Sequence, residues 1–233
     1  GIEAVTAEGT SVELSGETKR VVTDEKTYEG KTVVIATGAT HRKLGVPGEE
    51  RLTGAGVSYC ATCDGAFFRG KEVAVIGGGD VALEDALFLA RISSRVYLIH
   101  RRDAFRGAKS LQEKVFAAEN ITVIWDTVVE EVRGENRVEA LTLCNTVTKE
   151  TDSLPVSGVF VAVGIQPNTE LFGGQVELDK GGYVCAKEEG ATSVPGVFAA
   201  GDVRTKMLRQ VVTAASDGAN AVFSAEHYLN SLS

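Results

Sequence analysis

The residues with the most reactive chemistry are two cysteines, Cys60 and Cys63, which are followed directly by the carboxylic acid Asp64. Their spacing allows one small disulfide ring, and a helix that begins at this point could lower the pKa of one thiol. A neighbouring carboxyl group can deliver a proton to a leaving thiolate. An ordinary turn or N-cap residue is the alternative role for Asp64. The pattern predicts a redox disulfide, with Asp64 as a candidate acid beside it.

Two other interpretations apply to a pair of cysteines at this spacing. A structural zinc site needs two more ligands, but Cys144 and Cys185 stand isolated and no second Cys-x-x-Cys follows. Two unpaired thiols packed in a core are the other alternative. We favour the redox pair and predict no metal site.

A glycine-rich turn follows shortly after the cysteines. Gly77, Gly79 and Ala82 have the spacing G-x-G-x-x-A, between an apolar strand at 72–76 and a helix at 81–92. The first glycine permits a tight turn, the second lets the backbone approach a pyrophosphate, and the small third residue lets helix and strand pack closely. The helix N-terminus adds unpaired amides and a partial positive charge. We therefore predict a dinucleotide site, with a plain strand-to-helix turn as the alternative.

The next strand, at 95–99, ends in basic residues. An NAD site needs an acidic residue there, which binds the ribose 2′-hydroxyl. This chain has His100, Arg101 and Arg102 instead, with Arg106 one helical turn further on. Guanidinium groups suit a dianionic 2′-phosphate, so the pattern favours NADPH over NADH. A solvated basic surface is the alternative, and His100 by itself also suits stacking or packing.

Two shorter motifs lie near the end of the chain. Gly201 and Asp202 end a strand, and Arg209 and Gln210 precede the last helix. An aspartate at a strand end can accept a hydrogen bond from a ribityl or ribose hydroxyl, and a helix beginning near Gln210 can direct its dipole toward a flavin ring. A capped strand–helix loop is the alternative.

Hydrophobic periodicity predicts one contiguous βαβ region flanked by two pieces of a second domain. Candidate linkers lie at 41–49 and 164–169. The expected strands are 11–14, 20–23, 32–36, 72–76, 95–99, 121–124, 159–163, 181–184 and 197–200, with antiparallel strands in 127–150, and the expected helices are 81–92, 108–119 and 210–229.

Composition restricts the partners. The net charge of −8 argues against nucleic acid or an anionic membrane as the main partner. No apolar run reaches the ~18 residues of a membrane span, and four cysteines in 233 residues do not suit a disulfide-stapled secreted domain. We expect a cytoplasmic protein. The chain opens at Gly1 inside strand-rich sequence, without a signal peptide or an initiator methionine, which predicts that part of a longer protein precedes it.

With these motifs in this order, the chain resembles the low-molecular-weight, bacterial-type thioredoxin reductases over nearly all of its length. The resemblance implies an α/β fold with two Rossmann-like nucleotide-binding domains of the pyridine nucleotide-disulfide oxidoreductase type, one of them incomplete. Residues 1–43 and 168–233 would form the FAD-binding domain, and 44–167 the NADPH-binding domain that carries the cysteines. The matching motifs are Ala36-Thr37-Gly38, Cys60 to Gly65, Gly77 to Ala82, His100 to Arg106, Gly201-Asp202 and Arg209-Gln210.

The resemblance implies electron transfer from NADPH to FAD, then to the Cys60–Cys63 disulfide, then to thioredoxin, in a homodimer. Cys63 would face the flavin, Cys60 would attack the substrate, and Asp64 would be the acid. The NADPH domain would rotate on the two linkers. The positions matching the family's FAD site are Thr37, Gly38, Gly201, Asp202, Arg209 and Gln210. Those matching its NADPH site are Gly77, Gly79, Asp80, Ala82, Glu84, His100, Arg101, Arg102 and Arg106.

The chain departs from the family pattern at two places. The family's first βαβ unit, which carries a second glycine-rich turn for the ADP half of FAD, is absent, and Val81 stands where the family often has serine or threonine. Two alternative functions follow, namely a truncated, non-catalytic NADPH-binding module and a peroxiredoxin-reductase flavoprotein. A ferredoxin-driven reductase is disfavoured, because it would not need the arginine cluster.

Overall fold

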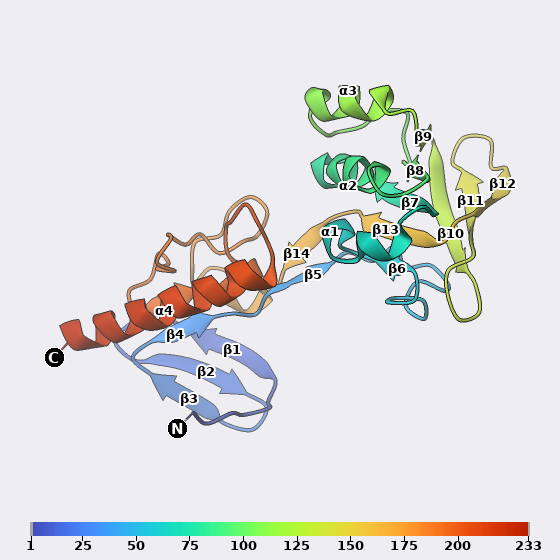
Figure 1. Cartoon of the computed structure of the whole chain (residues 1–233). Coiled ribbons are helices and arrows are strands. Elements are labelled where there is room, and N and C mark those ends of the chain that lie inside the picture. The colour runs from blue at the N-terminus through green and yellow to red at the C-terminus, as the bar shows by residue number, and fades with distance from the viewer. Residues whose placement is uncertain (1, 233) are drawn as a thin grey trace. The chain divides into compact units, whose positions relative to one another are not determined.

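The computed structural model describes residues 2–232, which divide into two compact units (Figure 1). The first, the outer unit, combines Gly1–Thr40 with Ile165–Ser233. The second, the inserted unit, is His41–Gly164. The division lies a few residues before each of the boundaries predicted at 43 and 167. The assignment of the units to FAD and NADPH stays a prediction at this point.

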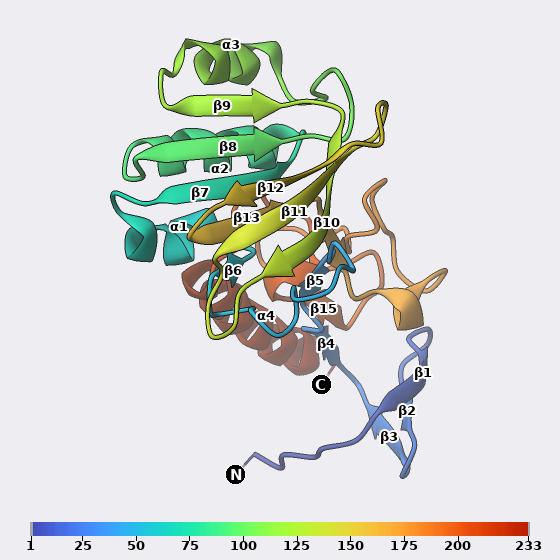
Figure 2. The same cartoon turned by 90° about the vertical axis from the view of Figure 1, so that its right-hand side faces the viewer.

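The inserted unit is built on a five-stranded parallel sheet in the order β6-β13-β7-β8-β9 (Figure 2). Parallel strands with both faces covered are near-continuously apolar, as the central strand β7 is. The strands are β6 (Val57–Ser58), β7 (Glu72–Gly77), β8 (Arg95–Ile99), β9 (Ile121–Ile124) and β13 (Gly158–Ala162).

The two faces of this sheet bury different partners, because successive side chains of a strand point to opposite faces. Val73 and Val75 pack in one cluster with the apolar sides of α2 (Asp80–Ala90) and α3 (Lys109–Ala117). Ala74 and Ile76 pack in another with an antiparallel meander. The meander strands are β10 (Thr127–Arg133), β11 (Ala140–Asn145) and β12 (Thr151–Pro155). The predicted strands and helices from 72 to 163 are therefore confirmed within a few residues.

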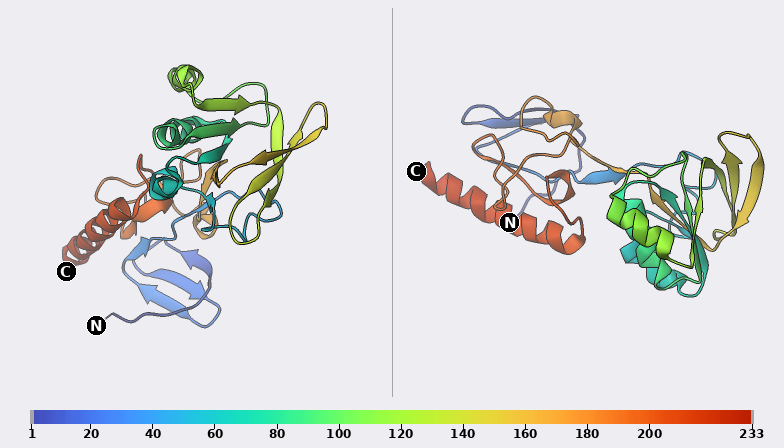
Figure 3. Two further views of the ribbon diagram at one scale, coloured as in Figure 1. Left: turned by 45° about the vertical axis from the view of Figure 1, so that its right-hand side comes forward. Right: turned by 90° about the horizontal axis from the view of Figure 1, so that it is seen from above.

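The outer unit collects short strands around its own core. An antiparallel sheet comes first, β4 pairs in parallel with β15, and β5 pairs with β14. Its strands are β1 (Gly9–Glu13), β2 (Lys19–Thr23), β3 (Thr27–Gly30), β4 (Val33–Ile35), β5 (Ala39–His41), β14 (Ile165–Pro167) and β15 (Val197–Ala199). A 3-10 turn, η2 (Glu170–Phe172), follows β14, and a second one, η3 (Gly201–Val203), lies between β15 and α4 (Val211–Ser231), the long helix that ends near the C-terminus (Figure 3).

One predicted strand, 181–184, is wrong. Asp179 Oδ1 accepts hydrogen bonds from the amides of Gly181 and Tyr183 at 2.8 and 2.9 Å, which folds this segment into a turn. Gly182 has a φ of 84°, which extended backbone does not allow. Only Val184 keeps strand-like pairing, as isolated bridges to Leu178 and Arg204.

Among the helices of residues 2–232, none combines the length and the apolar character needed to cross a membrane.

Candidate functional site

The two predicted redox cysteines are joined in the structure. Cys60 and Cys63 form a disulfide with an S–S distance of 2.05 Å and a Cα–Cα distance of 5.3 Å. Cys60 follows β6 and is the N-cap of the short helix α1 (Ala61–Asp64), where its sulfur accepts a hydrogen bond from the Cys63 amide at 3.2 Å. Cys63 is exposed and Cys60 is half-buried. Cys60, the residue that begins the helix, is thus the less exposed of the two.

Asp64 lies at the end of the same helix, and its side chain turns toward the sheet. Its Oδ2 accepts a hydrogen bond of 2.6 Å from the hydroxyl of Ser58. Within residues 2–232 it does not cap the 3-10 helix η1 (Gly65–Phe68) that begins after it. Asp64 therefore occupies the N-cap position of η1 without making a side-chain capping bond, and its carboxylate is bound by Ser58 instead. Ser58 was not singled out in the sequence, since its link to Asp64 depends on how β6 and α1 meet.

Close packing holds the disulfide segment in place. A Cβ on Gly65 would lie 3.0 to 3.2 Å from Phe88, Leu89 and Ile92, which belong to the end of α2 and the turn after it. A side chain at position 65 would push α1 away from α2. Glycine here therefore fixes the cysteine-bearing helix against the helix that follows the glycine-rich turn.

The glycine-rich turn has the geometry of a phosphate cradle. A Cβ on Gly77 would lie 2.5 Å from the carbonyl oxygen of Ala162 and 2.6 Å from the Cβ of Ala82, so this corner admits only small residues. A Cβ on Gly79 would have no heavy atom within 4 Å. The backbone at Gly79 therefore faces open space, at the N-cap of α2, where amide groups and the helix dipole attract a pyrophosphate.

His100 packs beneath this turn. It is 6% exposed, and its ring centroid lies 5.6 Å from that of Phe105 and 6.2 Å from that of Trp125. A Cβ on Gly78 would come within 2.3 Å of the His100 ring. Burial lowers the pKa of His100, which favours the neutral ring. The geometry favours the packing role over a direct contact with a nucleotide.

The three predicted arginines lie in the loop that closes over the turn. The amides of Arg106 and Gly107 donate to the carbonyl oxygen of Gly78 at 2.8 and 3.2 Å. Asp80 Oδ1 accepts from the amide of Ala108 at 2.7 Å, which ties the start of α2 to the same loop. The side chains of Arg101, Arg102 and Arg106 are exposed. Open space beside Gly79 and exposed guanidinium groups in one contacting loop fit a nucleotide with a 2′-phosphate.

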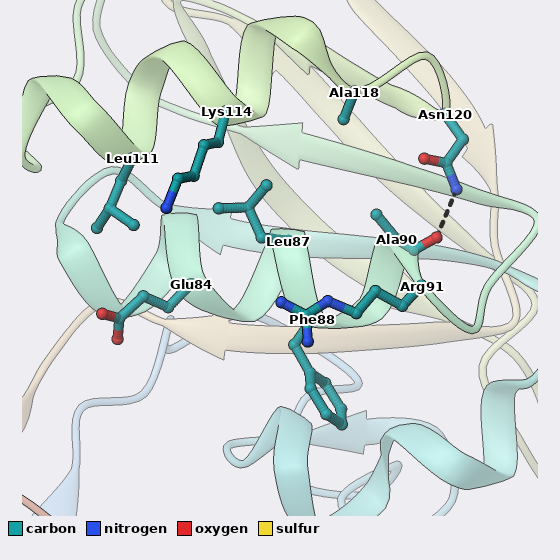
Figure 4. A pocket seen from close by; sticks show the side chains of 9 residues that line it. All are labelled: Glu84, Leu87, Phe88, Ala90, Arg91, Leu111, Lys114, Ala118 and Asn120. Carbon is teal, nitrogen blue, oxygen red and sulfur yellow. Dashed lines mark hydrogen bonds between the residues drawn. The ribbon is translucent and has the colours of Figure 1, made fainter.

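Glu84 occupies a different surface of the inserted unit. It lines a groove of about 480 Å³ between α2 and α3, together with Leu87, Arg91 and Lys114 (Figure 4). The amide of Asn120 closes one end of this groove by donating to the Ala90 carbonyl oxygen at 2.8 Å. Glu84 therefore lies in the groove between α2 and α3. The other residues predicted for the nucleotide site lie at the glycine-rich turn and in the arginine-bearing loop that contacts it.

Asp85, beside Glu84, gives a pH-dependent prediction. Burial, with a smaller contribution from Glu84, raises the pKa of the Asp85 carboxyl to about 6. The folded chain therefore favours the protonated carboxyl, which contributes stability at low pH. This contribution is lost as the pH rises through 6, because the carboxylate must then be buried with its charge. We expect Asp85→Asn to be more stable than the parent chain by about 2 kcal/mol at pH 8 and equally stable at pH 4, in urea unfolding.

The control for this prediction is Glu84→Gln, which removes an exposed carboxylate one residue away. Only a small change in stability is expected. An Asp85→Asn variant whose stability relative to the parent does not change between pH 4 and 8 would show that the carboxyl is solvated.

The predicted FAD-site residues lie in the outer unit. Thr37 Oγ1 donates to the carbonyl oxygen of Asn168 at 2.6 Å, and the Asn168 side-chain amide donates back to the Thr37 carbonyl oxygen at 2.8 Å. The Asn168 backbone amide donates to the carbonyl oxygen of Gly38, whose φ of 70° favours glycine. These bonds fix the turn after β4, a segment at the carboxyl end of a parallel strand, where ligands bind in α/β folds.

The FAD-site residues predicted near the end of the chain include two buried polar atoms that make no hydrogen bond within residues 2–232. Asp202 Oδ1 and Arg209 Nε are both buried without a hydrogen-bond partner among residues 2–232. The Arg209 guanidinium lies 4.0 Å from the centre of the Tyr183 ring. Gln210 is the N-cap of α4 and forms a capping box with Thr213. Unmatched polar atoms beside a helix N-terminus fit a ligand that carries hydroxyl and phosphate groups, as FAD does.

A buried ion cluster supports the loop that carries Asp202. Asp217 of α4 accepts hydrogen bonds from Arg204 at 2.8 Å, from Lys206 at 2.7 Å and from the Gly201 amide at 3.0 Å. Arg204 also donates to the carbonyl oxygens of Ala186 and Lys187. No local sequence pattern predicts this cluster, because its members come from separate segments.

No group of three or more His, Cys, Asp or Glu side chains within residues 2–232 is arranged to hold a metal ion.

Comparison with known proteins assigns the class. Residues 1–218 match the family described as pyridine nucleotide-disulphide oxidoreductase. The chain therefore belongs to the pyridine nucleotide-disulphide oxidoreductases, and within them to the thioredoxin reductases, as its relatives show. It is 46% identical over 235 residues to a thioredoxin reductase of Streptomyces coelicolor, with 100% of this chain and 73% of the relative covered.

Other relatives agree. A thioredoxin reductase of Mycolicibacterium smegmatis is 49% identical over 222 residues, with 94% of this chain and 71% of the relative covered. The crystal structure of thioredoxin reductase from Streptococcus pyogenes is 44% identical with a TM-score of 0.92, over 97% of this chain and 74% of that one. The predicted family and fold class are confirmed. FAD and NADPH are the cofactors of this family. The relatives named thioredoxin reductase favour that function over the two alternatives.

Proposed function

We propose that this chain passes electrons from NADPH, through FAD and the Cys60–Cys63 disulfide, to the disulfide of thioredoxin. The observation that carries the proposal is the disulfide with Asp64 beside it, on the same unit as the glycine-rich turn and its arginines. Relatives named thioredoxin reductase support the substrate. Thioredoxin as partner and the roles of individual residues are part of the proposal.

The nucleotide-site residues divide the binding of NADPH among them. Backbone amides at Gly79 and Asp80 hold the pyrophosphate, and Gly77 and Ala82 keep the corner small enough for it. Arg101, Arg102 and Arg106 bind the 2′-phosphate. His100 shapes the turn from beneath. Glu84 matches the family's position near the nicotinamide, but its side chain lines the groove between α2 and α3, so we assign it no contact with the nucleotide.

The FAD-site residues hold the flavin nucleotide in the outer unit. Asp202 accepts a hydroxyl hydrogen bond, Arg209 and Gln210 bind at the start of α4, and Thr37 and Gly38 line the turn after β4. FAD, when bound, supplies two-electron redox chemistry between a nicotinamide and a disulfide. The chain's own residues bind and orient it.

The thiol chemistry of the reduced chain balances without a further reagent. The Cys60 thiolate attacks one sulfur of the thioredoxin disulfide, and the departing thiolate takes the proton of Asp64. The Cys63 thiol then gives its proton to Asp64 and attacks the Cys60 sulfur, which releases the second thioredoxin thiolate. That thiolate is protonated by solvent, in exchange for the proton that Cys60 gave up on ionising. Two electrons leave the chain, and the Cys60–Cys63 disulfide is restored.

A surface beside the disulfide suits a protein substrate. Phe67 is 74% exposed in η1, the 3-10 helix that follows α1, and it lines a pocket of about 270 Å³ with Asp64, Lys71 and Arg137. An exposed aromatic ring beside a pocket is typical of the residues that dominate protein interfaces. We assign this surface to thioredoxin.

Phe67→Ala is expected to raise KM for thioredoxin about tenfold, because truncating an aromatic anchor typically removes one or two kcal/mol of binding. The turnover number and the affinity for NADPH are expected to stay unchanged. Steady-state kinetics with thioredoxin as the varied substrate measures this. Val147→Ala, at an equally exposed valine on the β11–β12 turn, is the control. Equal KM values for the parent chain and Phe67→Ala would show that thioredoxin does not bind at the surface around Phe67.

The proposed function is tested by counting thiols. With added FAD, each NADPH consumed should release two thiols from oxidised thioredoxin, read with a thiol-reactive dye. NADH should replace NADPH poorly. Consumption of NADPH without thiol release, or a chain that binds NADPH and transfers nothing, would contradict the proposal and favour the non-catalytic module.

The proposal also includes a homodimer in the cytoplasm. α4 leaves several apolar side chains exposed, and such a face suits a contact with a second copy. Its exposed apolar residues are Val211, Val212, Val222, Phe223 and Leu229. Light scattering after gel filtration measures the mass, and a monomer at micromolar concentration would contradict this part.

A further inference from the structure

Ser58 is a buried hydroxyl that touches two members of the redox site. It is 5% exposed at the end of β6. Its Oγ donates to Asp64 Oδ2 at 2.6 Å, accepts from the Cys60 amide at 3.0 Å, and lies 3.3 Å from the Cys60 carbonyl oxygen. One atom therefore joins the carboxyl group to the backbone of the cysteine.

At these distances the Ser58 hydroxyl has hydrogen-bond partners whether Asp64 is ionised or protonated. A serine hydroxyl has one proton and two lone pairs. With Asp64 ionised, the proton points to Oδ2. With Asp64 protonated, the carboxyl can donate to Oγ, and the serine proton can turn to the Cys60 carbonyl oxygen. The Cys60 amide keeps its acceptor in both cases.

We propose that Ser58 is a positioning residue that holds the Asp64 carboxyl in place through both halves of its proton transfer. The inference rests on the acid role of Asp64 in the proposed function. Backbone placement does not depend on the hydroxyl, because Ser58 pairs with Phe160 of β13 in the parallel sheet. Removing the hydroxyl therefore frees the carboxyl while leaving the strand in register.

The test follows thiol–disulfide exchange alone. The chain is reduced with dithiothreitol, desalted and mixed with oxidised thioredoxin, and disulfide transfer is followed by rapid acid quench and alkylation between pH 5.5 and 9. The parent chain is compared with Ser58→Ala, Asp64→Asn and the double variant. Ser94→Ala, at an exposed serine of the same unit, is the control, and Ser58→Thr restores a hydroxyl.

Ser58→Ala should slow the exchange about tenfold, the loss expected for one hydrogen bond to a charged group. The exchange rate of Ser58→Ala should fall below that of the parent chain only in the pH range where Asp64→Asn is also slower than the parent chain. The double variant should be no slower than Asp64→Asn, and Ser58→Thr should recover part of the rate. A merely structural serine would slow the exchange equally at every pH.

Two outcomes overturn the inference, and they differ. If Asp64→Asn exchanges as fast as the parent chain, the acid role fails and the inference fails with it. If Asp64→Asn is slow while Ser58→Ala matches the parent, or the two losses multiply in the double variant, the acid role stands and only the role of Ser58 is wrong. Circular dichroism shows that each variant is folded before the rates are compared.

Discussion

Asp217→Ala is expected to destabilise the outer unit by about 3–5 kcal/mol, the usual loss when one partner of a buried ion pair is removed. Asp217 is the shared acceptor of Arg204 and Lys206, and all three side chains are 10% exposed. Without the carboxylate, two positive charges would lie side by side in the interior with no counter-ion. Urea unfolding of the parent chain and the variant at pH 7 measures the difference.

The pH dependence gives an independent check on the same cluster. Burial by itself would raise the pKa of Asp217, but hydrogen bonds from Lys206 and Gly201 and the charge of Arg204 outweigh it and leave the pKa lowered. A lowered pKa contributes stability above the unfolded value near 4, and this is lost as the pH falls through the folded value. The gap between the parent chain and Asp217→Ala should therefore narrow in acid.

Asp152→Ala, at an exposed carboxylate of β12, is the matched control and should change stability little. An Asp217→Ala chain that unfolds at the urea concentration of the parent would mean that water replaces the lost carboxylate. The cluster also reaches the cofactor site, because Asp217 holds the Gly201 amide next to Asp202. A weaker affinity for FAD in the variant is the expected functional consequence.

The sequence predicted best what short-range patterns encode. β7, the glycine-rich turn, α2 and β8 lie within one continuous stretch, so apolar runs and helical periodicity locate them within a few residues. The arginines could be assigned because they follow directly on β8. The cysteine pair needed only its own spacing, since four consecutive residues of α1 and its N-cap bring the sulfurs together.

Long-range pairing was beyond such patterns. β14 is a three-residue strand inside the linker predicted at 164–169, and β5 is a three-residue strand that ends where the linker predicted at 41–49 begins. Each is a strand only because the other pairs with it. Ser58 and Asp217 carry no local signal, because their importance comes from partners on other elements. The turn at 181–184 was mistaken for a strand because the side chain of Asp179 competes with strand pairing.

Replacing Arg101 and Arg102 together with alanine is expected to raise KM for NADPH about 100-fold, because each charge-assisted hydrogen bond to the 2′-phosphate contributes roughly 1.5–3 kcal/mol. Both side chains are exposed in the loop that contacts the glycine-rich turn. KM for NADH should change little, since NADH carries no 2′-phosphate. The preference for NADPH would thus largely disappear while the turnover number is retained.

Binding of 2′,5′-ADP separates this effect from electron transfer. The double variant should lose its affinity for 2′,5′-ADP and keep the weak affinity of the parent chain for 5′-ADP, measured by titration calorimetry. Arg95→Ala is the control, because Arg95 is an exposed arginine at the opposite end of β8. If both nucleotides lost affinity equally, the arginines would act only through general positive charge. If neither did, the basic loop would be a solvated surface, and the basis for NADPH specificity would have to lie in other residues.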